Sequence, residues 1–208
     1  MRHRFAPYIA ALLLTSPATA PAELLPALGA DIQTVTVSGV SSGGYMAVQF
    51  HIAHSSTVDG VGVLAGGPYE CAADSTWNAL TRCMSPSFWN PLPPVEVFLQ
   101  RASRRAQAGD IDPLDGLVGD RAWIFSGGRD ETVRWPVVDS LDRFYRAWLP
   151  FGQTLFFTHP NAGHAMISNE EPEPNSCAST KPPFINRCGN FDAAGELLTH
   201  LLLSLIHI

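Results

Sequence analysis

The chain has 208 residues with a formal net charge of −6 at pH 7, and 46% of its residues are hydrophobic while 15% are charged. This composition is typical of a globular protein and excludes a disordered chain, and the length suggests one domain. The only basic cluster is Arg101 with the pair Arg104 and Arg105, which argues against nucleic acid as a partner. No run after residue 20 is apolar enough to cross a membrane.

The first 20 residues have the features of a secretory signal peptide. Arg2 and Arg4 form a basic start, an apolar stretch over 8–14 is too short to span a bilayer, and residues 18–20 (Ala-Thr-Ala) match an A-x-A cleavage site. We therefore expect a secreted or periplasmic protein that has no membrane association after cleavage. A short buried helix is the alternative interpretation.

Strands and helices alternate along the mature chain. The expected elements are a strand at 33–38, a helix at 44–54, a strand at 60–65, a helix at 95–107, a strand at 121–126, a helix at 137–149, a strand at 153–158 and a helix at 192–204. Segment 67–93 and the segment from 159 to 191 are expected to be loops. This alternation is typical of βαβ units and predicts a parallel sheet, hence an α/β fold.

The first strand leads into the motif Gly39-x-Ser41-x-Gly43, the G-x-S-x-G nucleophile elbow. A serine on so sharp a turn projects its hydroxyl above the sheet, and we expect side chains in place of Gly39 or Gly43 to collide. The helix that follows supplies backbone N–H groups and a positive dipole end for an oxyanion. The N–H of Ser42 is the expected first oxyanion-hole donor. A glycine-rich turn without chemistry is the alternative.

The acid partner is expected just past the strand at 121–126, where Asp130 lies in a glycine-rich turn. In α/β hydrolases the triad follows the chain order serine, acid, histidine. Glu131 is the alternative acid, and an ordinary turn aspartate is the interpretation without chemistry.

Two histidines, His159 and His164, follow the next strand. Gly163 gives the loop of His164 the freedom to bring its imidazole to the serine, whereas His159 is restrained by Pro160. We therefore expect His164 to take and return the proton of Ser41 while the acid orients the imidazole.

At this point the sequence resembles the catalytic domain of poly(3-hydroxybutyrate) depolymerases, in particular the single-domain secreted type. The resemblance rests on the segments at 38–47, 62–71, 126–133, 163–164, 175–177 and 185–188, and covers nearly all of 32–202. It implies a circularly permuted α/β-hydrolase fold and a serine esterase acting on short-chain hydroxyalkanoate polyester. The family's triad falls on Ser41, Asp130 and His164. Neither the resemblance nor the residues call for a cofactor.

Four cysteines in an exported chain are expected to pair, and three connectivities are possible. Local pairing of Cys71 with Cys83 and of Cys177 with Cys188 is the simplest and agrees with the family pattern. Each bond would close a loop of about a dozen residues, worth about 3 kcal/mol in the chain-entropy model. Zinc is disfavoured because the sequence has no C-x-x-C and no histidine at ligand spacing.

Aromatic residues in the expected loops include Trp77, Phe88, Trp89 and Trp135. Flat rings bury much area at low entropic cost, so these could lie against an apolar polyester. Packing under long loops is the alternative for each of them. Competing functions are an esterase for small acyl or aryl esters and a non-catalytic fragment.

The chain is expected to be incomplete, because only four strands can be counted and an α/β hydrolase places several more before its elbow. The resemblance implies that these strands, and a His-Gly-Cys type segment with the second oxyanion donor, come downstream, where this sequence has none. Residues 203–208 match one translated frame of a transposon-end sequencing adapter, and a genuine apolar helix end is the alternative. Residues 21–202 would then be the N-terminal part of the catalytic domain, and 203–208 a non-native tail.

Overall fold

The computed structural model describes residues 34–170 and 174–202, which all lie within one compact unit, Ile32–Ile208. The signal peptide predicted at 1–20 and the tail predicted at 203–208 lie outside the described residues, and both stay predictions.

A four-stranded sheet forms the centre of the described chain. Its strands are β1 (Thr36–Val40), β2 (Gly60–Leu64), β3 (Arg121–Gly127) and β4 (Thr154–His159), in the order β1-β2-β3-β4 and all parallel. The predicted parallel sheet is confirmed. Every residue of β2 and all but the first residue of β3 are buried, as expected for parallel strands that are covered on both faces, whereas β1 is only partly buried.

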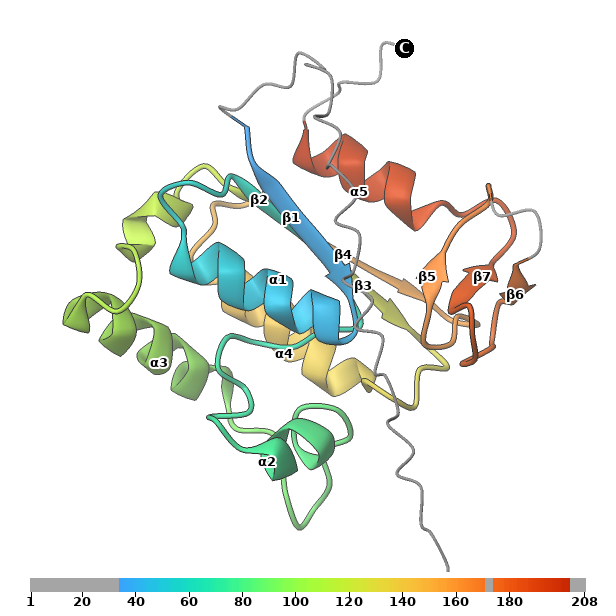
Figure 1. The fold of residues 1–208 in the computed structure, drawn as a ribbon, viewed down its shortest axis with the longest axis horizontal. Helices are drawn as coiled ribbons and strands as arrows, with labels where there is room; N and C mark the ends of the chain where they lie inside the picture. Colours follow the sequence, from blue (N-terminus) through green and yellow to red (C-terminus); the bar gives the residue numbers. More distant parts are fainter. Residues whose placement is uncertain (1–33, 171–173, 203–208) are drawn as a thin grey trace, which may run out of the picture. The chain divides into compact units, whose positions relative to one another are not determined.

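The helices follow the strands in the order expected for βαβ units (Figure 1). They are α1 (Ser42–Ala53), α2 (Thr76–Thr81), α3 (Val95–Ala108), α4 (Trp135–Arg146) and α5 (Ala193–Leu201), with a 3₁₀ helix, η1, at Leu114–Leu117. None of the helices in the described ranges is both long and apolar enough to span a bilayer.

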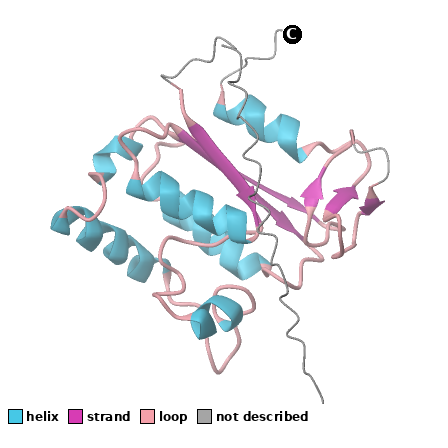
Figure 2. Cartoon of the chain, in the orientation of Figure 1, coloured by secondary structure: helices cyan, strands magenta, loops and turns pink. Residues whose placement is uncertain are grey.

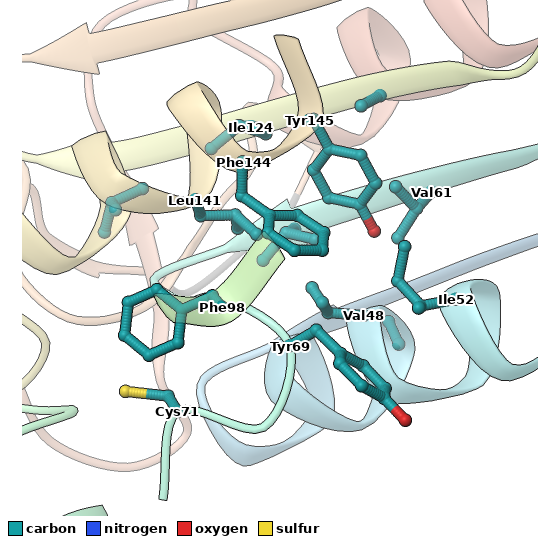
Figure 3. Close-up of a cluster of buried hydrophobic side chains, with 14 of the residues drawn as sticks. Val48, Ile52, Val61, Tyr69, Cys71, Phe98, Ile124, Leu141, Phe144 and Tyr145 are labelled. Carbon is teal, nitrogen blue, oxygen red and sulfur yellow. The ribbon is translucent and has the colours of Figure 1, made fainter. Parts of the chain in front are cut away.

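One face of the sheet is covered by α1 and α4, with α3 packed against α4. Side chains of alternate strand residues such as Val61 and Ile124 point to this face, where they meet Ile52 of α1, Phe98 of α3 and Phe144 of α4 (Figure 3). All five side chains are fully buried. This core holds α1, and with it the elbow, against the centre of the sheet.

The other face is covered by α5. The intervening strand residues Trp123 and Phe125 point to this side, where they share a second core with Leu197 and Leu201 of α5. Gly62 lies beneath the helix, and a Cβ atom placed on it would meet Leu197 at less than a van der Waals distance. The absence of a side chain at Gly62 is therefore what lets α5 pack closely on the sheet.

Two segments expected to be loops contain short regular elements. Helix α2 lies within 67–93, and the long loop before α5 contains β5 (Met166–Ile167), β6 (Asn175–Ser176) and β7 (Ile185–Arg187). These three strands form a second parallel sheet in the order β5-β7-β6, at one side of the long strands (Figure 2). The loop assignments were wrong there because strands of two or three residues, and a six-residue helix without a buried residue, have too little sequence to show a hydrophobic period.

Both predicted disulfides are present. Cys71 is bonded to Cys83, and Cys177 to Cys188. The first bond lies in the core under α1 and α3, and the second joins the small sheet to the core under α5. Each cross-link therefore holds a long loop at the carboxyl end of the four-stranded sheet.

Candidate active site

Ser41 occupies the turn between β1 and α1 with φ 57° and ψ −123°, in the left-handed region that non-glycine residues rarely adopt. Its N–H donates to the carbonyl of Leu64 at 2.9 Å, which ties the turn to the end of β2. A Cβ atom on Gly39 would lie 2.8 Å from the nitrogen of Gly44 and closer still to the carbonyl of Gly43. The turn is thus as tight as the nucleophile elbow requires.

The expectation of a collision at Gly43 was wrong. A Cβ atom built on this residue meets no atom within 4 Å. At Gly44 it would lie 3.1 Å from the carbonyl oxygens of Gly39 and Leu64. The glycines that the turn needs are therefore Gly39 and, less strictly, Gly44, because α1 crosses β1 at these two positions.

The Ser41 side chain forms no capping hydrogen bond with α1, although the residue stands at the N-cap. Its hydroxyl is therefore not engaged by the helix. The first N–H groups of a helix have no acceptor within the helix, and here Ser42 opens the first turn. The role of the Ser42 N–H as an oxyanion donor, and the absence of a second donor from the chain, stay predictions.

Asp130 follows β3 and is held from two sides. Its Oδ1 accepts hydrogen bonds from the backbone N–H groups of Thr132 at 2.8 Å and Val133 at 2.9 Å. Its Oδ2 lies 2.8 Å from Nδ1 of His164, and the carboxylate is almost fully buried. The neighbouring Glu131 points instead to solvent, where it pairs with Arg134 at 3.5 Å. The structure thus brings Asp130, and not Glu131, to the histidine.

His164 is buried beside Asp130. Because an ionised carboxylate only accepts hydrogen bonds, we assign the Nδ1 proton to this contact, which leaves Nε2 as the acceptor. A neutral imidazole in this tautomer can take a proton from a hydroxyl group at Nε2.

His159, the alternative base, lies elsewhere. Its Nδ1 accepts from the N–H of Asn161 at 3.3 Å and is 3.8 Å from Sγ of Cys177. The ligand atoms of His159, Cys177 and Cys188 lie within 4.8 Å of one another. The two sulfurs are joined in a disulfide, so this group lacks the thiolates that bind zinc.

Ser41 lies at the same edge of the sheet as the Asp130–His164 pair, because all three residues follow the carboxyl ends of parallel strands. Among the described contacts there is no hydrogen bond between the Ser41 hydroxyl and His164. Catalytic hydrogen bonds are often long in a free enzyme and tighten when substrate binds. The structure therefore brings Asp130 and His164 into hydrogen-bond contact and places Ser41 at the same carboxyl edge of the sheet.

A cavity of about 650 Å³ opens beside Ser41, between α1 and the loop that carries the Cys71–Cys83 disulfide. Its lining is mainly apolar and includes Met46, Leu80 and Met84. Within the wall, the hydroxyl of Tyr45 donates to the carbonyl of Cys83. Burial, reinforced by the charge of Asp130, raises the pKa of Tyr45 well above its usual range, so this phenol stays protonated.

The predicted substrate-binding tryptophans lie outside this lining. Trp77 is exposed on α2, and Trp89 is 88% exposed beside Phe88, which is 87% exposed and in edge-to-face contact with it at 5.2 Å. Trp135 is half-exposed at the start of α4, not in a loop, and stacks on Phe156. Their contact with substrate stays a prediction.

Sequence reasoning did not anticipate the groups that hold the triad in place. The amides of Thr132 and Val133 fix the Asp130 carboxylate, and the hydroxyl of Thr180 accepts a hydrogen bond from the N–H of His164 at 3.1 Å. An aspartate whose carboxylate accepts from the amides two and three residues later is a recognisable turn pattern. The Thr180 contact had no such signal, because 16 residues separate it from His164.

Two curated proteins are similar to this chain. It is 39% identical over 178 residues to a poly(3-hydroxybutyrate) depolymerase of Delftia acidovorans, an alignment that covers 85% of this chain and 35% of that protein. It is 32% identical over 200 residues to a polyhydroxybutyrate depolymerase of Talaromyces funiculosus, covering 95% of this chain and 56% of that protein. The chain thus spans little more than half of the second relative and about a third of the first. No protein-family model matches the sequence.

Solved structures agree with these relatives. A serine-to-alanine variant of a PHB depolymerase complexed with an R3HB trimer has a TM-score of 0.76 at 29% identity, over 88% of this chain and 56% of that one. The crystal structure of a PHB depolymerase from Penicillium funiculosum has a TM-score of 0.73 at 29% identity, over 84% and 53%. In sequence and in fold, the chain is similar to PHB depolymerases, and its parallel sheet flanked by helices is α/β-hydrolase-like.

Proposed function

We propose that this domain is a serine esterase that hydrolyses poly(3-hydroxybutyrate)-type polyester through an acyl-enzyme on Ser41. The observation that carries the proposal is the buried Asp130–His164 pair at the same sheet edge as Ser41 in the elbow conformation. Both curated relatives are named as depolymerases of this polymer, which supports the choice of substrate class.

The chemistry divides into two steps. Oγ of Ser41 attacks the carbonyl carbon of the ester while Nε2 of His164 takes the hydroxyl proton, and Asp130 stabilises the imidazolium that forms. The Ser42 N–H would bind the oxyanion. His164 then gives the proton to the leaving alcohol. Water, activated by the same imidazole, releases the hydroxyacid end from Ser41 and regenerates the serine.

The surface around the site supports a polymeric substrate. Phe88 and Trp89 form an exposed aromatic pair near α2, on the same loop that walls the cavity beside Ser41. Two adjacent exposed rings form one contiguous apolar surface, and contiguous apolar surface is a feature of interaction sites. The predicted signal peptide and the two disulfides support an exported enzyme, since disulfides persist in oxidising compartments.

An esterase for small acyl or aryl esters is the second candidate, and the apolar cavity beside Ser41 favours it. Its volume of about 650 Å³ is within the range of small-ligand pockets.

The double variant Phe88→Ala/Trp89→Ala separates the two candidates. Losing two rings from a polymer contact costs at least about 1.4 kcal/mol, or about tenfold in adsorption. We expect slower clearing of a polyhydroxybutyrate emulsion and unchanged kcat/KM on a soluble short-chain ester. Phe151→Ala is the matched control. Phe151 is fully exposed just before β4, and so lies at the amino ends of the strands, opposite to the carboxyl ends that carry the site. Wild-type hydrolysis of the soluble ester without any clearing of polymer would favour the small-ester esterase.

A further inference from the structure

The backbone of the His164 loop is held at two consecutive residues by one segment of the chain. The N–H of Gly163 donates to the carbonyl of Cys177 at 2.8 Å, and the N–H of His164 donates to Oγ1 of Thr180 at 3.1 Å. Residues 177–180 thus accept the hydrogen bonds of two consecutive backbone N–H groups, those of His164 and of the residue before it.

The fit between the two segments is close. A Cβ atom on Gly163 would lie 2.6 Å from the carbonyl oxygen of Ala178 and 2.5 Å from that of Ser179. Real Cβ atoms do not approach oxygen so closely, so a glycine is required here. The loop of His164 therefore cannot shift toward 177–180 without a clash, and it cannot shift away without breaking the two hydrogen bonds.

Residues 177–180 are themselves anchored from behind. The amide nitrogen of Asn186 on β7 donates to the carbonyls of Cys177 at 2.9 Å and Ser179 at 2.8 Å, and the Asn186 side chain is fully buried. The Cys177–Cys188 disulfide joins the same segment to the end of β7. A buried amide with two backbone partners and a cross-link two residues away make a rigid support.

We propose that Thr180 is a positioning residue for the catalytic base, and that the disulfide-linked segment 177–180 sets the orientation of the His164 imidazole. The inference rests on the proposed esterase function. Asp130 fixes the Nδ1 side of the ring, but a single hydrogen bond leaves the ring free to pivot about it. The Thr180 contact holds the backbone from which the ring projects, so that the ring and its Nε2 keep one orientation.

Thr180 lies outside the lining of the cavity beside Ser41. Losing its hydroxyl should therefore change the alignment of the base more than the binding of substrate. A misplacement of about 1 Å can cost as much as 10²-fold in rate, and a single loosened contact should cost less.

The test uses Thr180→Val, which keeps the shape and removes the acceptor, with Thr180→Ser as the conservative variant that restores it. We expect Thr180→Val to lower kcat on a soluble ester about tenfold with KM unchanged, and Thr180→Ser to recover most of it. Ser179→Ala is the matched control. Its hydroxyl bonds to that of Ser176 at 2.8 Å in the same segment and does not reach His164. Equal kcat for Thr180→Val and wild type would overturn the proposal, as would an equal loss in Ser179→Ala.

A second readout separates this proposal from the esterase itself. If wild type and Ser41→Ala both hydrolyse ester at background, the proposed function fails, and the imidazole is followed directly by ¹H NMR of the Nδ1 proton shared with Asp130. A shifted or broadened signal in Thr180→Val, with the wild-type signal in Thr180→Ser and Ser179→Ala, supports the positioning role. An unchanged signal in Thr180→Val overturns it.

Discussion

The conformation of Ser41 is the feature at the scale of single residues that argues most directly for chemistry. Holding a non-glycine residue in the left-handed region costs on the order of 1–3 kcal/mol, which the surrounding structure must offset. Here the hydrogen bond to Leu64 and the close crossing of Gly39 and Gly44 hold the turn in place. In this conformation the hydroxyl forms no capping hydrogen bond with α1.

The two glycines of the elbow should respond very differently to alanine. Gly39→Ala places a Cβ atom against the backbone of α1, which cannot yield as a flexible side chain would. Overpacking typically costs about 1–3 kcal/mol, and a backbone clash this close belongs at the upper end, which for a chain of this length lowers Tm by about 6–12 °C. Gly43→Ala meets open space at the start of a helix, where alanine is favoured over glycine by up to about 1 kcal/mol. Thermal unfolding followed by circular dichroism measures both.

A Tm for Gly43→Ala at or slightly above that of wild type is the expected control result. An equal loss of Tm in the two variants would mean that the turn needs glycine at both positions and that a Cβ atom on Gly43 does meet other atoms in the folded protein.

At the scale of single residues, the sequence predicted those site residues whose position follows from the order of the elements along the chain. Asp130 and His164 could be placed because each follows a strand in the order that the elbow predicts, and the structure brings these two together. The partners Thr180 and Asn186 could not be placed. Their contacts join segments that are far apart in the chain, and no local spacing marks a hydroxyl that accepts from the histidine's backbone.

The long elements were predictable from the sequence, because buried strands such as β2 and β3 are apolar runs between turn residues. The short ones were not. Strands β5, β6 and β7 depend on tertiary partners, among them the Cys177–Cys188 bond and the buried Asn186 amide, and not on a hydrophobic period. Helix α2 likewise lies in the loop closed by the Cys71–Cys83 disulfide, and none of its residues is buried.

Helix α5 is attached to the sheet partly through a histidine that should make folding sensitive to acid. His200 is buried with Nε2 3.0 Å from the carbonyl oxygen of Gln153. Burial lowers the pKa of His200, and the charge of Arg121 lowers it further, although the bond to Gln153 acts in the opposite direction. In the unfolded chain the imidazole titrates near its ordinary pKa of about 6.5.

The sign of the pH effect follows from this depressed pKa. Below about pH 6.5 the unfolded chain binds a proton that folded His200 resists, so the stability that His200 contributes is complete above that pH and is lost as pH falls through the folded pKa. His200→Gln keeps a donor for Gln153 but does not titrate. We expect its Tm to fall less than that of wild type between pH 7 and pH 5.

His54→Gln is the comparison variant, because it replaces an exposed histidine that follows α1 and leaves the contact of α5 with Gln153 in place. Identical Tm losses in wild type and His200→Gln would show that acid destabilises the fold through other groups.

At the scale of the whole described chain, the four-stranded sheet has a separate hydrophobic core on each face, and the two cores support different parts of the site. The core under α1, α3 and α4 fixes the nucleophile turn, and the core under α5 supports the small sheet behind His164. The fully buried side chain of His51 lies within the core under α1, α3 and α4. His51 of α1 bonds to Tyr145 of α4 at 3.1 Å and to Asp120 before β3 at 3.0 Å, so α1 is tied to both neighbours.

The central claim, that Ser41 is a nucleophile activated by His164, is tested most directly by covalent labelling with an aryl phosphonate and peptide mass spectrometry. We predict one adduct on the peptide that contains Ser41. It should be lost in Ser41→Ala and slowed at least about 10²-fold in His164→Ala, since removing a triad member costs orders of magnitude. His159→Ala should label at the wild-type rate. Labelling that persists in Ser41→Ala, or that is slowed equally by His159→Ala and His164→Ala, would contradict the account.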